Sequence, residues 1–555
     1  MEQSEMTPER LAQEHKAGVR FNEGIDLYDT VEVNENFFIG KQWEGVVSNG
    51  LPTPVFNFLK RVVLFSVANV STDNLKLHAK PMTGGGVPTA VMETFTDILN
   101  DQFAILFEQN AMGKLVREFC RNAAVDGDGC LYTYWDSDQD ASHGGKGRIR
   151  TEVLRNTQVL FGNPNCRDVQ SQPYILIERR MLLSEAREYA RRWGCAEAQA
   201  IVPDDKAAGN LEMDKLGGEK VTVLLRLWRD QRSGTIHAYE ATQTVEIRRE
   251  WDLGIQLYPL VWMNWDYVQD CYHGQAMITG LIPNQIFVNK LFAMSMISLM
   301  TLAYPKVIYD KTKVAKWSAK VGAAIGVNGA VDTVAKIMDP AAVSPQIAQF
   351  IDTAVGYTQR FLGASDAALG DARPDNTSAI IALQRAAATP MELTRQSLLQ
   401  CIEDLGRIYM AFEAEYYGER TVEVELDGFQ SKEPIRFDFS TLKVIPCGID
   451  LDAGASSYWS EIANMQTLDN LLMQGKIPTS EYLRRLPAGQ ITDREALIAV
   501  TEAAERGRMA ASAALQGVGD GAAQRLEQLP VRGGPGYNAL QRKINEAGQA
   551  PKEVG

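Results

Sequence analysis

The sequence predicts a helix-rich α+β protein, and three observations support this fold class. Strand-like runs are concentrated before about residue 265, at 130–136, 149–154 and 221–230. Helical patterns dominate the rest of the chain, above all at 274–303 and 376–418. Apolar residues make up 45% of the 555 residues and charged residues 23%, which is typical of a soluble globular protein with a core of normal size.

The elements of the first half follow from its hydrophobic pattern. Residues 1–29 are predicted to form a polar arm with some helix, and the alternation at 75–81 predicts a strand. One long helix is expected over 89–124, because apolar residues recur there at steps of three and four; they are Phe95, Ile98, Leu99, Phe103, Leu106 and Phe107. The turn sequence at 126–129, Asp-Gly-Asp-Gly, should end this helix.

The second half alternates long helices with small modules. A helix at 274–303 should end before Pro305, since proline disfavours helical geometry in the residue that precedes it. A small module with a strand-like start follows at 304–345, then a helix at 346–362 and a Gly- and Asp-rich break at 363–375. Pro390 should kink the long helix at 376–418, because it removes one backbone hydrogen bond. Two strands at 421–439, a helical hairpin at 457–506 with its turn at 475–479, and a partly disordered tail complete the pattern.

Bulk properties exclude several classes of protein. The polar start predicts no signal peptide, and the most apolar segment, 291–304, is shorter than the roughly 20 residues of a membrane span. The seven cysteines form no C-x-x-C pair, which fits a reducing compartment. The net charge of −14 argues against a protein that grips nucleic acid over its whole surface, but not against one that surrounds DNA and lets it slide.

No motif in the sequence predicts a reaction, a cofactor or a metal site. Asp136, Asp138 and Asp140 have the spacing of a calcium loop, but Ala141 and Gly147 stand where that loop needs glycine and glutamate. A solvated hairpin loop is the better interpretation. The segment SHGGKGR lacks the spacing of a phosphate-binding loop, and none of the five histidines has a histidine partner at i+4.

Two amides at the start of the apolar helix are spaced four residues apart. Gln285 and Asn289 therefore lie on one face of that helix. They either belong to a functional surface or are simply two satisfied amides on a buried helix, and the second interpretation is favoured by the sequence alone.

The order of these elements resembles that of tailed-bacteriophage portal proteins, the head-tail connectors. The stretch FLGASDAALGDARPDNTSAIIALQRAA at 361–387 is similar to the tunnel-loop region of that family. The segments NENFFIGKQWEG, YPLV at 258–261, and Tyr304-Pro305-Lys306 also resemble portal sequences, as do NPNCRDVQSQPYILIERRMLLSEAREY at 163–189 and QTLDNLLMQGKIPTSEYLRRLP at 466–487.

The resemblance implies a portal fold that assembles as a ring of about twelve identical subunits. It maps an α/β wing onto 30–269 and 420–454, stem helices onto 270–303 and 346–362, and a small α/β clip onto 304–345. The tunnel loop would be 363–375, the long kinked helix 376–419, the helical crown 455–510 and the tail 511–555. The ring would be a DNA channel at one capsid vertex of the virion, assembled in the host cytoplasm, for genome packaging, retention and ejection.

The same resemblance implies partners and site residues. The partners would be double-stranded DNA, the terminase motor, a head-tail adaptor and the major capsid and scaffolding proteins, with no membrane and no cofactor. The tunnel loop would present Gly363, Asp366, Gly370, Asp371, Arg373, Asp375 and Asn376. The stem would contribute Gln285, Asn289, Lys290 and Arg360, and docking at the clip would use Lys306, Lys311, Lys313, Lys316 and Lys320.

The distribution of charge is consistent with different roles for the clip and the tunnel loop. Residues 304–339 carry a net charge of +3 and residues 346–375 one of −2. The basic module could meet an acidic partner or phosphates, or be an ordinary solvated surface. An acidic loop would hold DNA only weakly, since phosphate contacts slow release; Arg373 is the expected polar contact. The alternatives are another head-tail adaptor or structural ring protein of a virion and, less favoured, a nucleic-acid-processing enzyme.

Overall fold

The computed structural model describes residues 6–71, 75–82, 89–140, 146–206, 214, 217–303, 307–314, 316, 318, 320, 324–337, 346–361, 391–425, 432–443, 447–452, 458–486, 497, 498, 500 and 501. These residues form a mixed α/β structure in which helices outweigh strands, in agreement with the predicted α+β class. The chain divides into two compact units, residues 1–454 and 455–555.

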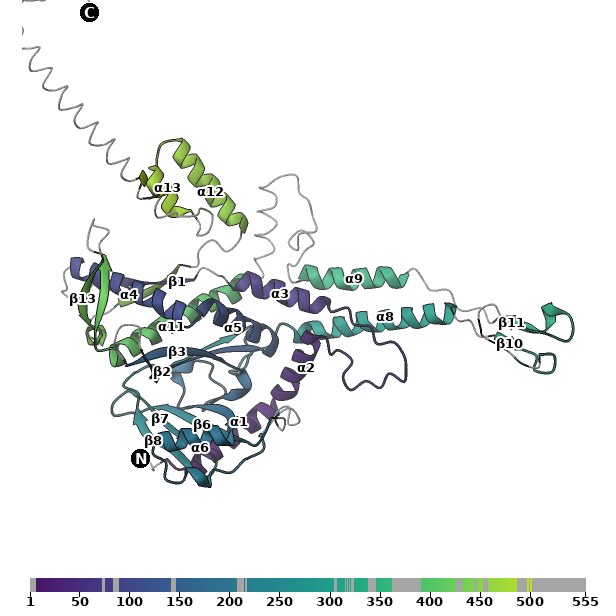
Figure 1. Cartoon of the computed structure of the whole chain (residues 1–555), viewed down its shortest axis with the longest axis horizontal. Coiled ribbons are helices and arrows are strands. Elements are labelled where there is room, and N and C mark those ends of the chain that lie inside the picture. The colour runs from purple at the N-terminus through teal and green to yellow at the C-terminus, as the bar shows by residue number, and fades with distance from the viewer. Residues whose placement is uncertain are drawn as a thin grey trace, which may run out of the picture. The chain divides into compact units, whose positions relative to one another are not determined.

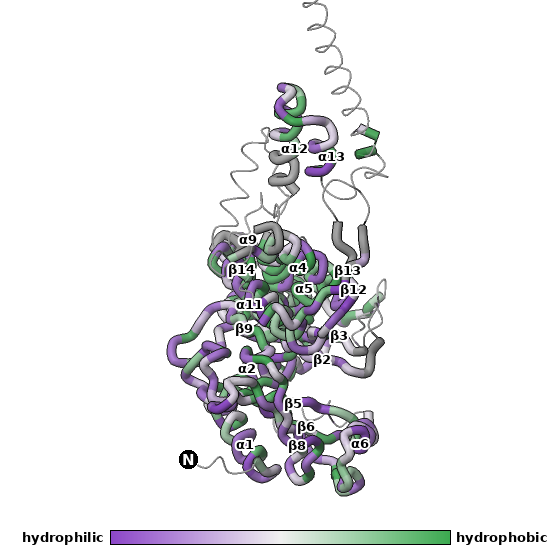
Figure 2. Tube along the Cα trace, turned by 90° about the vertical axis from the view of Figure 1, so that its left-hand side faces the viewer, coloured by the Kyte–Doolittle hydropathy of each residue, from purple (hydrophilic) through white to green (hydrophobic). Residues whose placement is uncertain are grey.

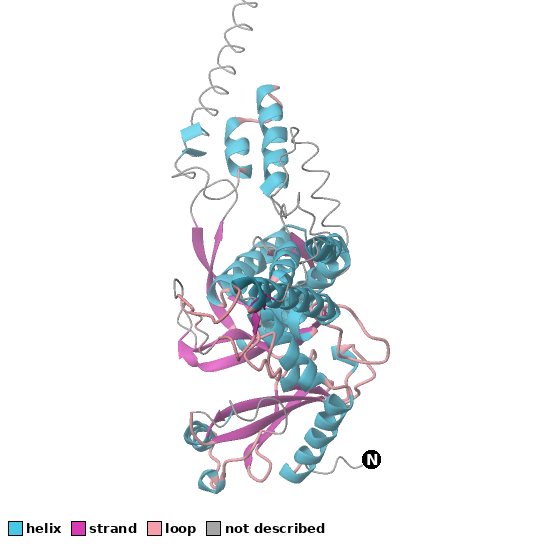
Figure 3. Ribbon diagram, turned by 90° about the vertical axis from the view of Figure 1, so that its right-hand side faces the viewer, coloured by secondary structure: helices cyan, strands magenta, loops and turns pink. Residues whose placement is uncertain are grey.

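The N-terminal segment is more ordered and more buried than a polar arm. Helix α1 (Pro8–Gly24) begins with a side-chain cap, in which Thr7 accepts a hydrogen bond from the backbone N–H of Arg10. Leu11 and Val19 of α1 pack with Leu160 and Leu224. Figure 3 shows the N-terminal helix beside the strands of a sheet. The predicted arm boundary at residue 29 falls inside α2 (Leu27–Ile39).

The five-stranded antiparallel sheet under α1 has the order β4-β5-β6-β7-β8. Its strands are β4 (Val159–Phe161), β5 (Ile175–Leu182), β6 (Lys220–Arg229), β7 (Ile236–Ala241) and β8 (Glu246–Asp252). The predicted strand at 221–230 is confirmed as β6. Helix α6 (Leu183–Arg192) packs its Ala186 and Ala190 with Val221 and Val223 of β6.

A three-stranded sheet with the order β3-β2-β9 forms a second layer. Its strands are β2 (Asp128–Asp140), β3 (Lys146–Leu154) and β9 (Leu260–Asn264). The predicted strands at 130–136 and 149–154 are confirmed, and they pair as an antiparallel hairpin. Asp136 and Asp140, expected in a solvated hairpin loop, lie instead in β2, where they pair with Arg148 and Lys146 of β3.

The main core lies between the sheets and four helices: α3 (Phe58–Val70), α4 (Thr89–Gln109), α5 (Met112–Asp126) and α11 (Glu392–Tyr416). Hydrophobic positions are plentiful along the tube around α4 and α5 (Figure 2). The expectation of one helix over 89–124 is wrong, because Ala111 takes a left-handed conformation, with φ 50°, and separates α4 from α5. The preceding Asn110 fixes this break, since its side chain accepts a hydrogen bond from the Thr151 N–H at 2.9 Å and donates one to the Ile149 carbonyl at 3.2 Å.

Two further two-stranded sheets belong to this unit. Strand β1 (Lys76–Pro81), predicted at 75–81, pairs with β14 (Cys447–Asp452), which brings the predicted second part of the wing back to the first. Strands β12 (Glu419–Glu425) and β13 (Lys432–Asp438) pair with each other and confirm the two strands expected at 421–439.

Helices α8 (Ile282–Ala303) and α9 (Gln346–Phe361) flank a short two-stranded sheet of β10 (Val307–Tyr309) and β11 (Ala335–Ile337). Figure 1 shows α8 and α9 side by side. The prediction for α9 is confirmed, but the helix expected from residue 270 or 274 begins only at Ile282. Residues 266 and 275 instead form an antiparallel bridge within the segment that precedes α8.

The second unit contains a helical hairpin, described here by itself. Helix α12 (Tyr458–Met473) and α13 (Thr479–Arg485) are joined by a turn in which Gly475 has a φ of 66°. The Tyr482 hydroxyl donates a 2.6 Å hydrogen bond to Asp469 across the hairpin. The predicted hairpin with a turn at 475–479 is confirmed for these residues, whereas the predicted tail at 511–555 lies outside the described residues.

Candidate stem and clip

The predicted stem is an antiparallel pair of helices joined by a polar contact near its base. The Asn284 side-chain amide of α8 donates a 3.1 Å hydrogen bond to the Thr358 hydroxyl of α9, and Thr358 is buried. A cavity of about 920 Å³ lies beside this contact, lined by Phe287, Tyr357 and Met391 among others. Residues of α8, of α9 and of the start of α11 therefore line the same cavity.

Gln285 and Asn289 form a buried amide relay at the start of α8. The Gln285 side chain donates to the Phe56 carbonyl at 2.8 Å and to Asn289 Oδ1 at 2.9 Å, and it accepts from the Leu59 N–H at 3.3 Å. Asn289 donates in turn to Gln42 Oε1 at 2.6 Å. Both amides are buried and satisfied, so they fix α8 to the segment between α2 and α3. This arrangement is the simpler of the two interpretations that the sequence left open.

Beyond this base, α8 is apolar on faces that no other described part of the chain covers. Five large side chains on it are between 40% and 55% exposed: Phe287, Met294, Met296, Leu299 and Met300. On α9, Phe350 and Tyr357 are exposed as well. Lys290 is the one basic residue of α8 and is exposed. Arg360 lies in the last turn of α9.

The predicted clip presents basic side chains around a short sheet. Lys311, Lys316 and Lys320 are exposed, and Lys313 forms an ion pair with Asp310 at 3.4 Å. Hydrogen bonds from Thr312 hold the pKa of Asp310 below its usual value. Three of the five predicted docking lysines are thus open to a partner, and Lys306 lies outside the described residues.

The predicted tunnel loop also lies outside the described residues. This applies to Gly363, Asp366, Gly370, Asp371, Arg373, Asp375 and Asn376, and to the predicted helix kink at Pro390. Their roles stay predictions.

A buried polar cluster that the sequence reasoning missed anchors the chain just before α8. Asp128 accepts hydrogen bonds from Asn264 at 2.7 Å and from the Gly274 N–H at 2.6 Å, and His273 lies 2.7 Å from its other oxygen. Gly274 allows this close approach, because a Cβ atom there would lie 2.8 Å from the Asp266 carbonyl oxygen. The Asp-Gly-Asp-Gly turn was the only signal in the sequence, and it predicted a turn rather than an anchor.

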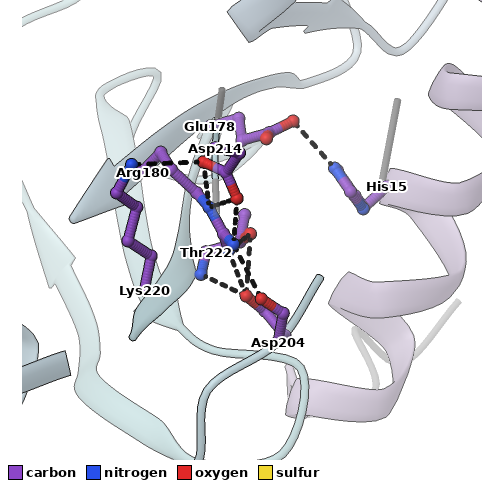
Figure 4. A network of polar contacts seen from close by, with 7 residues as sticks. All are labelled: His15, Glu178, Arg180, Asp204, Asp214, Lys220 and Thr222. Carbon is purple, nitrogen blue, oxygen red and sulfur yellow. Dashed lines mark hydrogen bonds and ion pairs between the residues drawn. The ribbon is translucent and has the colours of Figure 1, made fainter. Parts of the chain in front are cut away.

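A second polar network stiffens the wing near α1 (Figure 4). Arg180 of β5 donates to both carboxylate oxygens of Asp214, to Asp204 and to the Thr222 hydroxyl. Its hydrogen bonds hold the pKa of Asp214 below its usual value. On the same strand, Glu178 lies 3.3 Å from His15 of α1. Each charged group has a structural partner, so this network supports the loops around β5 and β6.

Neither a metal-binding cluster nor a membrane-spanning helix occurs among the residues that the structure describes. Within them, no group of three or more His, Cys, Asp or Glu side chains could hold a metal ion. No helix among them is long and apolar enough to cross a bilayer.

Comparison with known protein families gives a match to part of the chain. Residues 185–436 match the model of the phage P22-like portal protein family, a range that runs from α6 through α8, α9 and α11 to β13. No curated protein matches the chain. The motifs of the sequence and this match agree, and the resemblance to the tailed-phage portal protein family is therefore confirmed over residues 185–436.

Proposed function

We propose that this chain is the subunit of a portal ring, through which double-stranded DNA enters and leaves the head of a tailed phage. The ring lies at one capsid vertex of the virion and has a structural, non-enzymatic role. The family match supports the assignment to portal proteins. Ring assembly and DNA passage rest in addition on the properties of α8.

The exposed apolar surface of α8 carries the proposal. Side chains such as Met294 and Leu299 are about half exposed, and α9 covers only one side of the helix. Apolar surface of this extent marks an interaction site on a soluble protein. A closed ring places a copy of the chain on each side of every subunit, so it can cover faces that α9 leaves open.

The clip and the tunnel loop divide the remaining roles. The exposed lysines of the clip suit docking of an acidic adaptor or of the packaging motor. The acidic composition of 363–375 suits a loop that touches passing DNA without holding it, with Arg373 as the polar contact. Arg373→Ala should lower the amount of DNA packaged or retained per particle; unchanged packaging and retention would remove Arg373 from this role.

Assembly is tested by placing a charge in the apolar surface of α8. Leu299→Glu should abolish rings in negative-stain images and in native mass measurements, because a carboxylate would be buried between subunits without a partner. The matched control is Val202→Glu, an equally exposed apolar residue of the wing that should leave rings intact. Rings of unchanged size and stability for Leu299→Glu would contradict the proposal.

A further inference from the structure

The two layers of the wing enclose a pocket that the portal assignment does not use. The pocket has a volume of about 650 Å³ and lies between the five-stranded sheet, the β2–β3 hairpin and the end of α11. Its size is in the range of cavities that hold a small molecule or a few side chains of a partner. It goes beyond the ring proposal and does not depend on it.

Aromatic side chains dominate the wall. Three of the nine tryptophans of the chain, Trp135, Trp193 and Trp251, line this one pocket. Trp135 stacks on Tyr416 with ring centroids 5.0 Å apart, and Tyr189 lies edge-on to Trp193. Tryptophan, tyrosine and arginine are the residues most enriched where proteins bind other proteins.

Arg248 is held in a fixed orientation in this wall. Its guanidinium lies between two indole rings, 3.7 Å from the centroid of Trp193 and 3.6 Å from that of Trp251. Within the described part of the chain, Arg248 has no hydrogen-bond acceptor and no ion pair. Stacking leaves the edge of a guanidinium free to donate hydrogen bonds, and a carboxylate is its best planar acceptor.

The other charged groups of the wall show that Arg248 stands apart. Arg179 has two anionic neighbours, Glu152 at 3.5 Å and Glu240 at 3.8 Å. Burial lowers the pKa of Arg248, and the nearby carboxylate of Glu240 opposes this shift. Arg248 is therefore a positioned cation that no described carboxylate contacts through a hydrogen bond or an ion pair.

Glu240 interacts with Tyr189 and Arg179 rather than with Arg248 through a hydrogen bond. It is the cross-strand partner of Arg248 between β7 and β8, and it is 1% exposed. Its Oε2 accepts a 2.9 Å hydrogen bond from the Tyr189 hydroxyl. Its Oε1 is buried, has no hydrogen bond from any residue that the structure describes, and lies 3.8 Å from Arg179. An acidic side chain entering the pocket would therefore be the hydrogen-bond acceptor that Arg248 lacks among the described residues.

We propose that this aromatic pocket binds a peptide segment of another protein, and that an acidic side chain of this segment pairs with Arg248. The aromatic wall receives the apolar part of the segment and Arg248 its carboxylate. A small carboxylate without an apolar part would leave the aromatic wall unused.

The test uses the full-length protein and two pools of acetylated, amidated pentapeptides with random flanking residues. One pool has glutamate at its centre and the other glutamine, and the bound fraction is measured by mass spectrometry after equilibrium dialysis. The glutamate pool should be retained at least tenfold more than the glutamine pool. Equal retention of the two pools, or retention of neither, would overturn the proposal.

Two variants place the effect at the pocket. Arg248→Met should lower retention of the glutamate pool at least tenfold, because it keeps the stacked chain but removes the guanidinium. Arg249→Met is the matched control, since Arg249 is the next residue of β8, has a side chain that is 92% exposed and pairs only with Glu246 in the described structure. If both variants retain the glutamate pool as the unaltered protein does, the pocket is not the binding site. If Arg248→Met fails to fold, the comparison of the two pools on the unaltered protein still tests whether an acidic side chain is required.

Discussion

Helices α8 and α11 are both long and rich in apolar residues, but they differ in how far their apolar side chains are buried. On α11 the apolar stripe is buried in the main core; it consists of Leu398, Ile402, Leu405, Tyr409 and Phe412. On α8 only the first turns are buried, and the apolar side chains beyond Asn289 are exposed on several faces. A helix apolar on several faces needs neighbours on several sides.

The difference separates two sources of stability. The apolar surface of α11 is buried by its own chain and contributes to the folding of a single subunit. The outer part of α8 contributes little to a single subunit, and in the proposed ring its burial would depend on the neighbouring subunits. Substitutions on the two helices should therefore have different consequences.

The largest effect on folding is expected from Phe412→Ala. Phe412 is 1% exposed and stacks on Tyr416, so the cavity left behind should lower the free energy of unfolding by roughly 3–5 kcal/mol. Urea unfolding of the unassembled subunit measures this change. Leu299→Ala on α8 should change the same quantity by less than about 0.5 kcal/mol. Equal losses for the two variants would remove the distinction between the helices.

A pH-dependent effect of the next size is expected at Glu413, which is fully buried in α11. Neither of its carboxylate oxygens has a hydrogen-bond partner among the described residues, and burial raises its pKa from 4.5 to about 8, opposed by Arg420. The unfolded chain loses this proton near pH 4.5 and the folded chain only near pH 8. The group therefore lowers the stability of the fold progressively as the pH rises between these values.

Glu413→Gln should remove that dependence. The variant should be more stable than the unaltered protein by on the order of 3 kcal/mol at pH 9 and nearly equal to it at pH 5. Glu415→Gln is the control, because Glu415 pairs with Lys443 on the surface and should change stability by less than about 1 kcal/mol at either pH. A Glu413→Gln variant with no gain at pH 9 would contradict a buried, unpaired carboxyl group.

A smaller effect on the free energy of unfolding is expected at the start of α8, where its buried first turns meet its exposed apolar part. Asn289→Ala removes the donor to Gln42 Oε1 and the acceptor of one Gln285 amide hydrogen bond in a buried site, so the free energy of unfolding should fall by about 1–3 kcal/mol. Asn284→Ala removes a half-open contact with Thr358 and should cost about 0.5–1 kcal/mol. Chemical denaturation measures the loss of unfolding free energy for both variants. A larger loss for Asn284→Ala than for Asn289→Ala would show that the amide relay does not anchor the helix.

Local patterns predicted much of the fold. The strands of the β2–β3 hairpin, β6, the β12–β13 pair and helix α9 all follow from periodicity within one segment. The break at Ala111 could not be predicted in this way, because it has neither glycine nor proline and depends on hydrogen bonds from Asn110 to a strand far along the chain. The late start of α8 has the same kind of cause, since contacts to Asp128 hold the residues before it.

The candidate sites show the same limit. The amides of α8 were recognised from their spacing, but their partners, Gln42 and the backbone around Phe56, come from a distant segment. The aromatic pocket was not predicted at all, because Trp135, Trp193 and Trp251 belong to different elements, and no sequence pattern connects them. Tertiary contacts, rather than local preference, create both sites.

The central claim, that neighbouring subunits cover α8, can be tested on the unaltered protein through its methionines. Purified assemblies would be treated with hydrogen peroxide, and oxidation at each methionine followed by peptide mass spectrometry. Met294, Met296 and Met300 are about half exposed in the single chain, Met112 is buried and Met473 is 86% exposed. We predict that the three methionines of α8 oxidise as slowly as Met112 in the assembly. Oxidation of these three at the rate of Met473 would contradict the claim.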